Sequence, residues 1–277
     1  MPELPEVETT RRGIAAHVRG RRIADVIVRE ARLRWPVPPD LARLLIGSRV
    51  ESVDRRAKYL LFRMTDARGR AAGTLIGHLG MSGSLRIVPA STTPQLHDHV
   101  DLLFDGGRVL RLRDPRRFGS LLFTREDSAL HPLLRELGPE PLSPQFDGGH
   151  LAAEARGRSV AVKSFVMDSR VVVGVGNIYA SEALWRAAIH PRRPAGRISR
   201  ARFDALAAAV KSVLQAAIRK GGTTLRDFVK ADGEAGYFRI ELDVYGRASA
   251  PCRRCATPIR RALIGQRSAF FCPRCQR

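Results

Sequence analysis

The sequence predicts an α+β protein with a strand-rich first half, a helical second half and a short cysteine-rich tail. Three observations support this order. Compact apolar runs of strand length, separated by glycine turns, recur between residues 23 and 123. Beyond residue 150 the composition favours helix, and four cysteines in two pairs follow in the last part of the chain. Many short strands joined by glycine turns are typical of a sandwich or a barrel.

The first half begins with a predicted helix. Pro5 suits its first turn, and Glu6 and Glu8 lie where the helix dipole favours acidic side chains. Gly20 is placed to end it. Two later apolar runs flank Asp105-Gly106-Gly107, a sequence typical of a hairpin turn. The predicted strands are Val26–Val28, Tyr59–Phe62, Val100–Phe104, Val109–Leu112 and Leu121–Phe123.

Prolines and glycines cluster between His131 and His150, which indicates an interdomain linker at residues 132–150. The segments that follow favour helix at Leu151–Arg156, Ser181–Ala188 and Arg200–Lys220. Residues 221–240 are rich in glycine, threonine and polar groups and are predicted to form a loop. We therefore expect a domain over 1–131, the linker, a helical domain over 151–242 and a tail domain over 243–277.

Composition narrows the class of protein. A hydrophobic content of 44% beside 27% charged residues excludes a wholly disordered chain. No stretch approaches the roughly 20 apolar residues that a membrane span needs. The acidic start of the sequence lacks the apolar region of a secretory signal. We expect a cytoplasmic protein with no membrane partner.

The net charge favours a polyanionic binding partner. The 48 Lys and Arg residues exceed the 27 Asp and Glu residues by 21. Neutralising phosphates with such a surplus releases condensed counterions, which favours nucleic-acid binding. The alternatives are a general bias toward arginine and an anionic membrane. The bias does not explain why eight Arg and no acidic residue lie between Val244 and Arg277, and no basic amphipathic helix stands out.

All four cysteines lie in this tail, as two pairs with two-residue spacing: Cys252, Cys255, Cys272 and Cys275. Sixteen residues separate the pairs, which fits a four-cysteine zinc site. Disulfides are disfavoured in the cytosol, and a redox site needs only one such pair. We expect one structural Zn²⁺ that folds the tail and performs no chemistry, because a four-cysteine site is closed.

Five motifs, in order, resemble those of the formamidopyrimidine-DNA glycosylase family. They are Met1-Pro2-Glu3-Leu4-Pro5-Glu6-Val7-Glu8, Asp114-Pro115-Arg116-Arg117-Phe118-Gly119, Val173-Gly174-Val175-Gly176-Asn177-Ile178-Tyr179-Ala180-Ser181-Glu182, Gly221-Gly222-Thr223-Thr224-Leu225-Arg226-Asp227-Phe228, and the finger from Cys252 to Gln276. The resemblance implies an N-terminal β-sandwich with a flanking helix, a helical domain with a helix–two-turn–helix, and a zinc-finger β-hairpin. It also implies a monomer that binds double-stranded DNA containing oxidised bases or abasic sites.

The resemblance assigns catalytic roles to residues whose chemistry suits them. Removal of Met1 would leave a secondary amine at Pro2, and an α-amino group with a pKa of about 7.7–8.0 is partly neutral and nucleophilic. Glu3 is the implied proton donor, and Glu6 is a weaker candidate that could instead cap the helix. Lys58 matches the lysine of β-elimination, and it is one of five lysines against 43 arginines. Arg267 matches the arginine of δ-elimination, where it would stabilise the departing phosphate. Without the resemblance, Pro2 and Glu3 would be an ordinary second residue and a surface carboxylate.

The resemblance also implies residues that contact DNA. A nucleotide flipped out of the duplex leaves a void that side chains must fill. The implied void-filling residues are Met81, Arg116 and Phe118, and those implied to position phosphates are His97, Arg158, Lys163 and Asn177. The implied lesion contacts are Thr223, Arg226 and Tyr245.

The predicted function is a bifunctional DNA glycosylase/AP lyase for oxidised purines, chiefly 8-oxoguanine and formamidopyrimidines. Two alternatives remain. One is an endonuclease VIII-like glycosylase for oxidised pyrimidines, and the other is a non-catalytic zinc-finger protein that binds damaged DNA.

Overall fold

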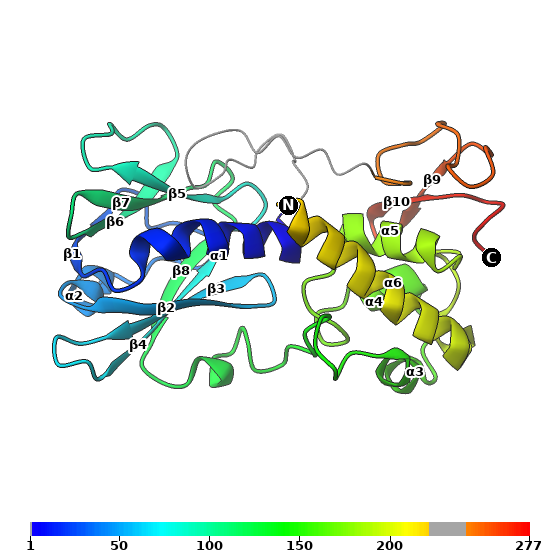
Figure 1. Ribbon diagram of the computed structural model, residues 1–277, viewed down its shortest axis with the longest axis horizontal. Coiled ribbons are helices and arrows are strands. Elements are labelled where there is room, and N and C mark those ends of the chain that lie inside the picture. Colours follow the sequence, from blue (N-terminus) through cyan, green and yellow to red (C-terminus); the bar gives the residue numbers. More distant parts are fainter. Residues whose placement is uncertain (1, 222–241) are drawn as a thin grey trace. The chain divides into compact units, whose positions relative to one another are not determined.

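The computed structural model describes residues 2–221 and 242–277 (Figure 1). The described chain divides into two compact units, the first reaching Arg135 and the second beginning at Glu136. The second unit also contains the segment from residue 242 onward. Each unit is described by itself.

The first unit begins with α1 (Leu4–Val18), as the sequence predicts. Pro5 lies in the first turn, and Gly20 follows the helix with φ +76°, a left-handed conformation that favours glycine. Val7, Ile14 and Val18 form one buried face of this helix, each at most 1% exposed.

Two four-stranded antiparallel sheets pack around one core, so the sandwich is confirmed over the barrel. One sheet has the order β2 (Arg49–Arg56), β3 (Tyr59–Thr65), β4 (Ala71–His78), β8 (Ser120–Thr124). The other has the order β1 (Ile23–Val28), β6 (Asp98–Phe104), β7 (Arg108–Arg113), β5 (Ser84–Pro89). All five predicted strands are present, and Gly106 and Gly107 form the β6–β7 turn with positive φ. The short helix η1 (Ser128–Leu130) follows β8.

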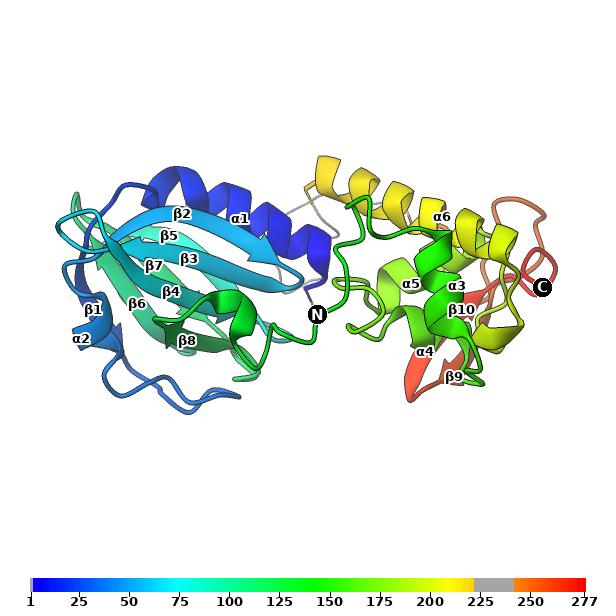
Figure 2. The ribbon, with the colours of Figure 1, turned by 90° about the horizontal axis from the view of Figure 1, so that it is seen from below.

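Each open side of the sandwich is covered by a helix. Helix α1 packs on β2 and β5, the edge strands on one side (Figure 2). Helix α2 (Leu41–Leu45) packs on β1 and β8, the edge strands on the other. Covered edges cannot pair with further strands.

The strand register places several turns at the same end of the sandwich. In one sheet Tyr59 pairs with His78, and His78 pairs with Ser120. In the other, Arg113 pairs with both Ser84 and Asp98. The β4–β5 and β7–β8 connections join these two rows. The turns that carry Lys58, Met81, His97 and Arg116 therefore lie at the same end, which we call the turn end.

The second unit consists of helices and a hairpin. Helix α5 (Asn177–Arg186) packs on α6 (Arg200–Arg219), α4 (Val162–Val166) and β10, and α3 (Gly148–Ala155) packs on α6. The other elements are η2 (Ala195–Arg197), β9 (Arg260–Ile264) and β10 (Arg267–Phe271). Helix α3 begins three residues before the predicted Leu151, because the Asp147 carboxylate caps it by accepting the His150 N–H at 2.8 Å. None of the described helices has the length and apolar character to cross a bilayer.

Candidate active site and nucleic-acid interface

The start of α1 holds two buried carboxylates beside Pro2. Glu3 is 2% exposed, Glu6 is 1% exposed, and Pro2 is buried as well. The Glu3 backbone N–H donates to Glu6 Oε2 at 2.8 Å, so Glu6 fixes the entry to the helix. The capping role that the sequence offered as the alternative for Glu6 is therefore present. This arrangement places two buried carboxyl groups next to Pro2.

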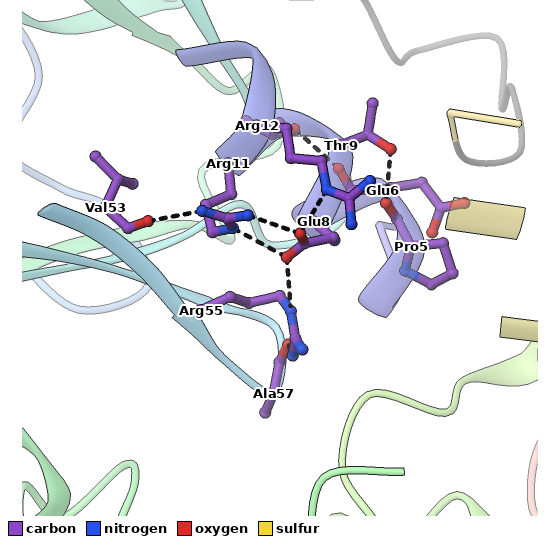
Figure 3. Close-up of polar contacts among 10 residues, drawn as sticks. Pro5, Glu6, Glu8, Thr9, Arg11, Arg12, Val53, Arg55 and Ala57 are labelled. Atoms are coloured by element: carbon purple, nitrogen blue, oxygen red, sulfur yellow. Dashed lines mark hydrogen bonds and ion pairs between the residues drawn. The ribbon is translucent and has the colours of Figure 1, made fainter. Parts of the chain in front are cut away.

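Glu8 connects the same helix to the turn that carries Lys58 (Figure 3). Its carboxylate accepts two hydrogen bonds from Arg11, one from Arg12 at 2.7 Å and one from Arg55 at 3.3 Å. Arg55 Nη1 also donates to the Ala57 carbonyl at 2.8 Å. Burial raises the pKa of Glu8, but the hydrogen bonds from Arg11 and Arg12 and the neighbouring positive charges outweigh it and lower the pKa to about 2. Hydrogen bonds through Glu8 and Arg55 thus connect the first turns of α1 to the turn that carries Lys58.

His78 lies beside this turn and was missed by the sequence analysis. Its ring centroid is 4.8 Å from that of Tyr59. Burial, with the positive charges of Lys58 and Arg34, lowers the pKa of His78 to about 4. Because Nδ1 accepts the Gly80 N–H at 3.1 Å, the neutral ring carries its proton on Nε2. The strand-ending histidine of His78-Leu79-Gly80-Met81 was the available signal.

The implied void-filling residues lie on two neighbouring turns of the turn end. Met81 is 37% exposed and Phe118 is 39% exposed, which is high for large apolar side chains. The Arg116 guanidinium carbon lies 4.9 Å from the centroid of the Phe118 ring. His97 is half-buried on a third turn and has φ +74°. The first unit therefore brings these four residues to the end that also carries Lys58.

A second cluster lies within the second unit. Lys163 is 1% exposed, and its ammonium donates to Asn177 Oδ1 and to the Ser268 carbonyl. Asn177 Nδ2 in turn donates to the Tyr245 hydroxyl at 3.5 Å. These bonds join α4, the start of α5 and β10. Lys163 thus positions its neighbours, and Asn177 and Tyr245 are the more accessible members of the cluster.

Glu182, on α5, was also missed. It is 3% exposed, and its carboxylate accepts the backbone N–H groups of Asp243, Val244 and Tyr245 at 2.8–3.0 Å. Burial raises the pKa of Glu182, while the three N–H bonds favour the ionised form. This single side chain fixes the backbone that carries Tyr245. An acid within the apolar run from Ile178 to Trp185 was the signal.

The four cysteines converge as their spacing predicts. All four Sγ atoms lie within 4.8 Å of one another, and the contacts range from 3.4 to 4.0 Å. A tetrahedral zinc with Zn–S bonds of about 2.3 Å places its sulfurs about 3.8 Å apart. No disulfide joins them. The cluster therefore fits one structural Zn²⁺.

Comparison with known proteins accounts for nearly the whole chain. The Formamidopyrimidine-DNA glycosylase N-terminal domain matches residues 1–121, the Formamidopyrimidine-DNA glycosylase H2TH domain matches 137–229, and the zinc finger found in FPG and IleRS matches 250–277. The formamidopyrimidine-DNA glycosylase of Methylococcus capsulatus is 61% identical over 100% of both chains. The chain belongs to the formamidopyrimidine-DNA glycosylase family.

Solved structures of this family agree. A complex between the Lactococcus lactis Fpg and DNA containing an abasic site has a TM-score of 0.90 and 31% identity, covering 99% of both chains. A complex between a mutant of the same Lactococcus lactis protein and DNA containing Fapy-dG has a TM-score of 0.90 and 32% identity, covering 100% of both chains. The predicted α+β fold with its sandwich, helical domain and zinc finger is confirmed.

The family zinc finger is fixed to α5 by polar and aromatic contacts. Arg254 lies 4.0 Å from the Trp185 ring centroid and donates to the Trp185 carbonyl at 3.0 Å. Gln276, which is 2% exposed, donates to the Ile189 carbonyl and accepts the Cys272 N–H. The finger thereby acquires a fixed position on the helix.

Arg267 follows the tip of the finger hairpin. Gly265 and Gln266 form a two-residue turn with φ of +54° and +58°, and the exposed Arg267 begins β10. A Cβ on Gly265 would lie 2.8 Å from Ser164 Oγ, so the tip packs closely on α4. Arg158, the other implied phosphate contact on this unit, stacks on Phe165 at 5.5 Å and pairs with Glu154. Thr223 and Arg226 lie outside the described residues.

Proposed function

We propose that this protein is a bifunctional DNA glycosylase/AP lyase of base excision repair that removes oxidised purines, chiefly 8-oxoguanine and formamidopyrimidines. The match to the family along the full chain, with Pro2-Glu3 at the head of α1, carries the proposal. The substrate is double-stranded DNA, in keeping with a net charge of +21. Such a substrate would place the enzyme with the nucleoid in the cytoplasm.

Base removal uses the amine of Pro2 after Met1 has been removed. The nitrogen lone pair attacks C1′ of the damaged nucleotide, and the bond from C1′ to the base breaks. The departing base takes up the amine proton of Pro2, Glu3 protonates the ring oxygen as the bond from C1′ to that oxygen breaks, and the product is an iminium between Pro2 and C1′. Glu6 holds the Glu3 backbone and thereby orients both groups.

Strand cleavage follows from the iminium. The cation acidifies the C2′ protons, and loss of one expels the 3′ phosphate by β-elimination. A second elimination expels the 5′ phosphate and leaves a one-nucleoside gap with phosphate ends. Lys58 serves the first elimination and Arg267 the second, where its guanidinium stabilises the departing phosphate.

DNA contacts divide between filling the void and holding the backbone. Met81, Arg116 and Phe118 occupy the space of the extruded nucleotide, which their exposure on adjacent turns supports. His97, Arg158 and Asn177 position phosphates, and Lys163 acts through Asn177. The proposed lesion contacts are Thr223, Arg226 and Tyr245. The zinc site orders the finger that presents Arg267, and the active species is a monomer.

The decisive experiment is borohydride trapping on a duplex with 8-oxoguanine opposite cytosine, followed by peptide mapping. We expect a covalent adduct at Pro2 in the wild type, and slower formation of any adduct in Pro2→Gly. An adduct at another amine would overturn the assignment of the nucleophile. Tight binding to abasic duplex without any adduct would instead support the non-catalytic binding protein.

Substrate choice is tested separately. Single-turnover excision of 8-oxoguanine should exceed that of thymine glycol in duplexes of equal sequence. The reverse order would indicate the endonuclease VIII-like enzyme and overturn the assignment of oxidised purines.

A further inference from the structure

Asp114 directly follows β7 at the turn end, and its carboxylate joins two turns. It is 0% exposed. Oδ1 accepts the Ser82 hydroxyl at 2.8 Å, and Oδ2 accepts the Gly119 N–H at 2.7 Å. Ser82 directly follows Met81, and Gly119 directly follows Phe118. One buried carboxylate therefore connects the residues next to Met81 and Phe118. These are the two apolar side chains proposed to fill the void in the duplex, and we call them the wedges.

The backbone of Asp114 reaches a third turn. Its N–H donates to the His97 carbonyl at 3.0 Å, and its carbonyl accepts His99 Nε2 at 2.8 Å and the Arg117 N–H at 3.1 Å. Ser82 Oγ in turn accepts the Arg116 N–H at 3.2 Å. The turns of Met81, His97 and Arg116–Phe118 all meet at this residue.

The backbones of the Met81 and Phe118 turns approach each other closely. Gly80 has φ +63°, and a Cβ there would lie 2.4 Å from the Phe118 carbonyl carbon. A Cβ on Gly119 would lie 2.7 Å from the His78 carbonyl oxygen. The directional bonds of Asp114 act together with this close packing to fix the spacing of the two turns.

We propose that Asp114 is a positioning residue that holds Met81 and Phe118 at a fixed spacing for insertion into the duplex. The proposal rests on the proposed function. A carboxylate suits this position because its two oxygens accept from one hydroxyl and one backbone N–H, whereas an amide could keep both contacts only by reversing the Ser82 bond, so that Ser82 accepts. Asp114 touches neither the reacting sugar nor Pro2 in this account.

If Met81 and Phe118 are no longer held at a fixed spacing, extrusion of the base should slow while the later chemical steps keep their rates. An intact lesion pair must be opened before excision, whereas a preformed abasic site has no base to extrude. Loss of the Asp114 bonds should therefore slow excision of paired 8-oxoguanine more than cleavage of an abasic duplex. A merely structural loss would slow both equally.

The test compares single-turnover rates on these two duplexes for wild type, Asp114→Asn, Ser82→Ala and the double variant. We expect each single variant to lower 8-oxoguanine excision about tenfold or more and abasic-site cleavage less than about twofold. Because both residues act through one bond, the double variant should be little worse than Asp114→Asn alone. If Asp114→Asn does not fold, Ser82→Ala alone still tests the proposal.

Asp101→Asn is the matched control. Asp101 is also buried in the sandwich at 2% exposure, but its carboxylate pairs with Arg29 and Arg111 and with no residue of these turns. It should lower Tm without changing the ratio of the two rates. Equal losses on both duplexes in Asp114→Asn, or fully additive losses in the double variant, would overturn the proposal. A wild type that cleaves neither duplex would instead overturn the proposed function.

Discussion

The turn end of the sandwich and the zinc finger both present residues proposed to contact DNA, but they are held rigid by different means. The turn end lies on a core of many buried apolar side chains from both sheets and α1, and buried carboxylates then fix its turns. The buried apolar cluster at the finger has five residues, of which Trp185 belongs to α5 and two are themselves cysteines of the zinc site. A region that buries so little apolar surface cannot offset its chain entropy, so it needs the metal. Metal ligation therefore substitutes for a large apolar core where the chain is short.

The largest expected effect is removal of zinc. Structural zinc contributes about 10–16 kcal/mol to the folding of isolated fingers, so chelation or Cys272→Ser should unfold this one. Duplex affinity should fall at least about tenfold because Arg267 loses its support, while the sandwich stays folded. Filter binding with and without chelator measures the affinity, and far-UV circular dichroism follows the strands of the sandwich. Re-addition of Zn²⁺ should restore the chelated protein but not the variant. Unchanged affinity would show that the finger does not hold the interface.

The next largest effect is expected for Glu182→Ala. This variant tests whether a buried carboxylate stabilises the region beside the finger as much as one stabilises the turn end. It leaves three buried N–H groups of Asp243–Tyr245 without their acceptor. We expect a loss of about 3 kcal/mol in the free energy of unfolding, and about half of that for Glu182→Gln. Urea denaturation measures both. A loss below about 1 kcal/mol would mean that water replaces the carboxylate.

The Glu8 network should make the sandwich sensitive to acid. Its pKa of about 2 lies below the unfolded value of 4.5, so its contribution is complete above pH 4.5 and is lost as pH falls toward 2. The shift corresponds to stability on the order of 3 kcal/mol. Denaturation across this pH range should show a steeper decline in wild type than in Glu8→Gln. Parallel curves would contradict the role of this carboxylate.

The smallest effect is expected for an exposed ion pair in the same strands. Asp54 pairs with Arg63 at 3.1 Å, with both side chains nearly half exposed. Asp54→Asn should change the free energy of unfolding by less than about 0.5 kcal/mol. This variant is the control for Glu8→Gln, because it removes an acid from the same region without removing a buried one. A loss as large as that of Glu8→Gln would show that burial is not the deciding factor.

Apolar pattern and spacing predicted much of the fold. The predicted strands and helices were found, because compact apolar runs and caps act locally. Strand β2 was missed because Arg49–Arg56 is mostly charged and alternates only weakly between buried and exposed positions. The zinc cluster was predictable because its ligands come in pairs with fixed spacing.

The positioning residues could not be predicted in the same way. Asp114 bonds to Ser82, 32 residues earlier, and Glu182 bonds to Val244, 62 residues later. Such roles depend on strand register and helix packing, which no local pattern encodes. The roles of Pro2, Glu3 and Lys58 rest on the family resemblance together with their chemistry.

Helix α1 begins two residues after the proposed nucleophile Pro2 and covers the edge strands β2 and β5. Uncovered edge strands are templates for intermolecular β-pairing. A molecule that loses this helix by proteolysis therefore loses its chemistry and gains an aggregation-prone edge in the same event.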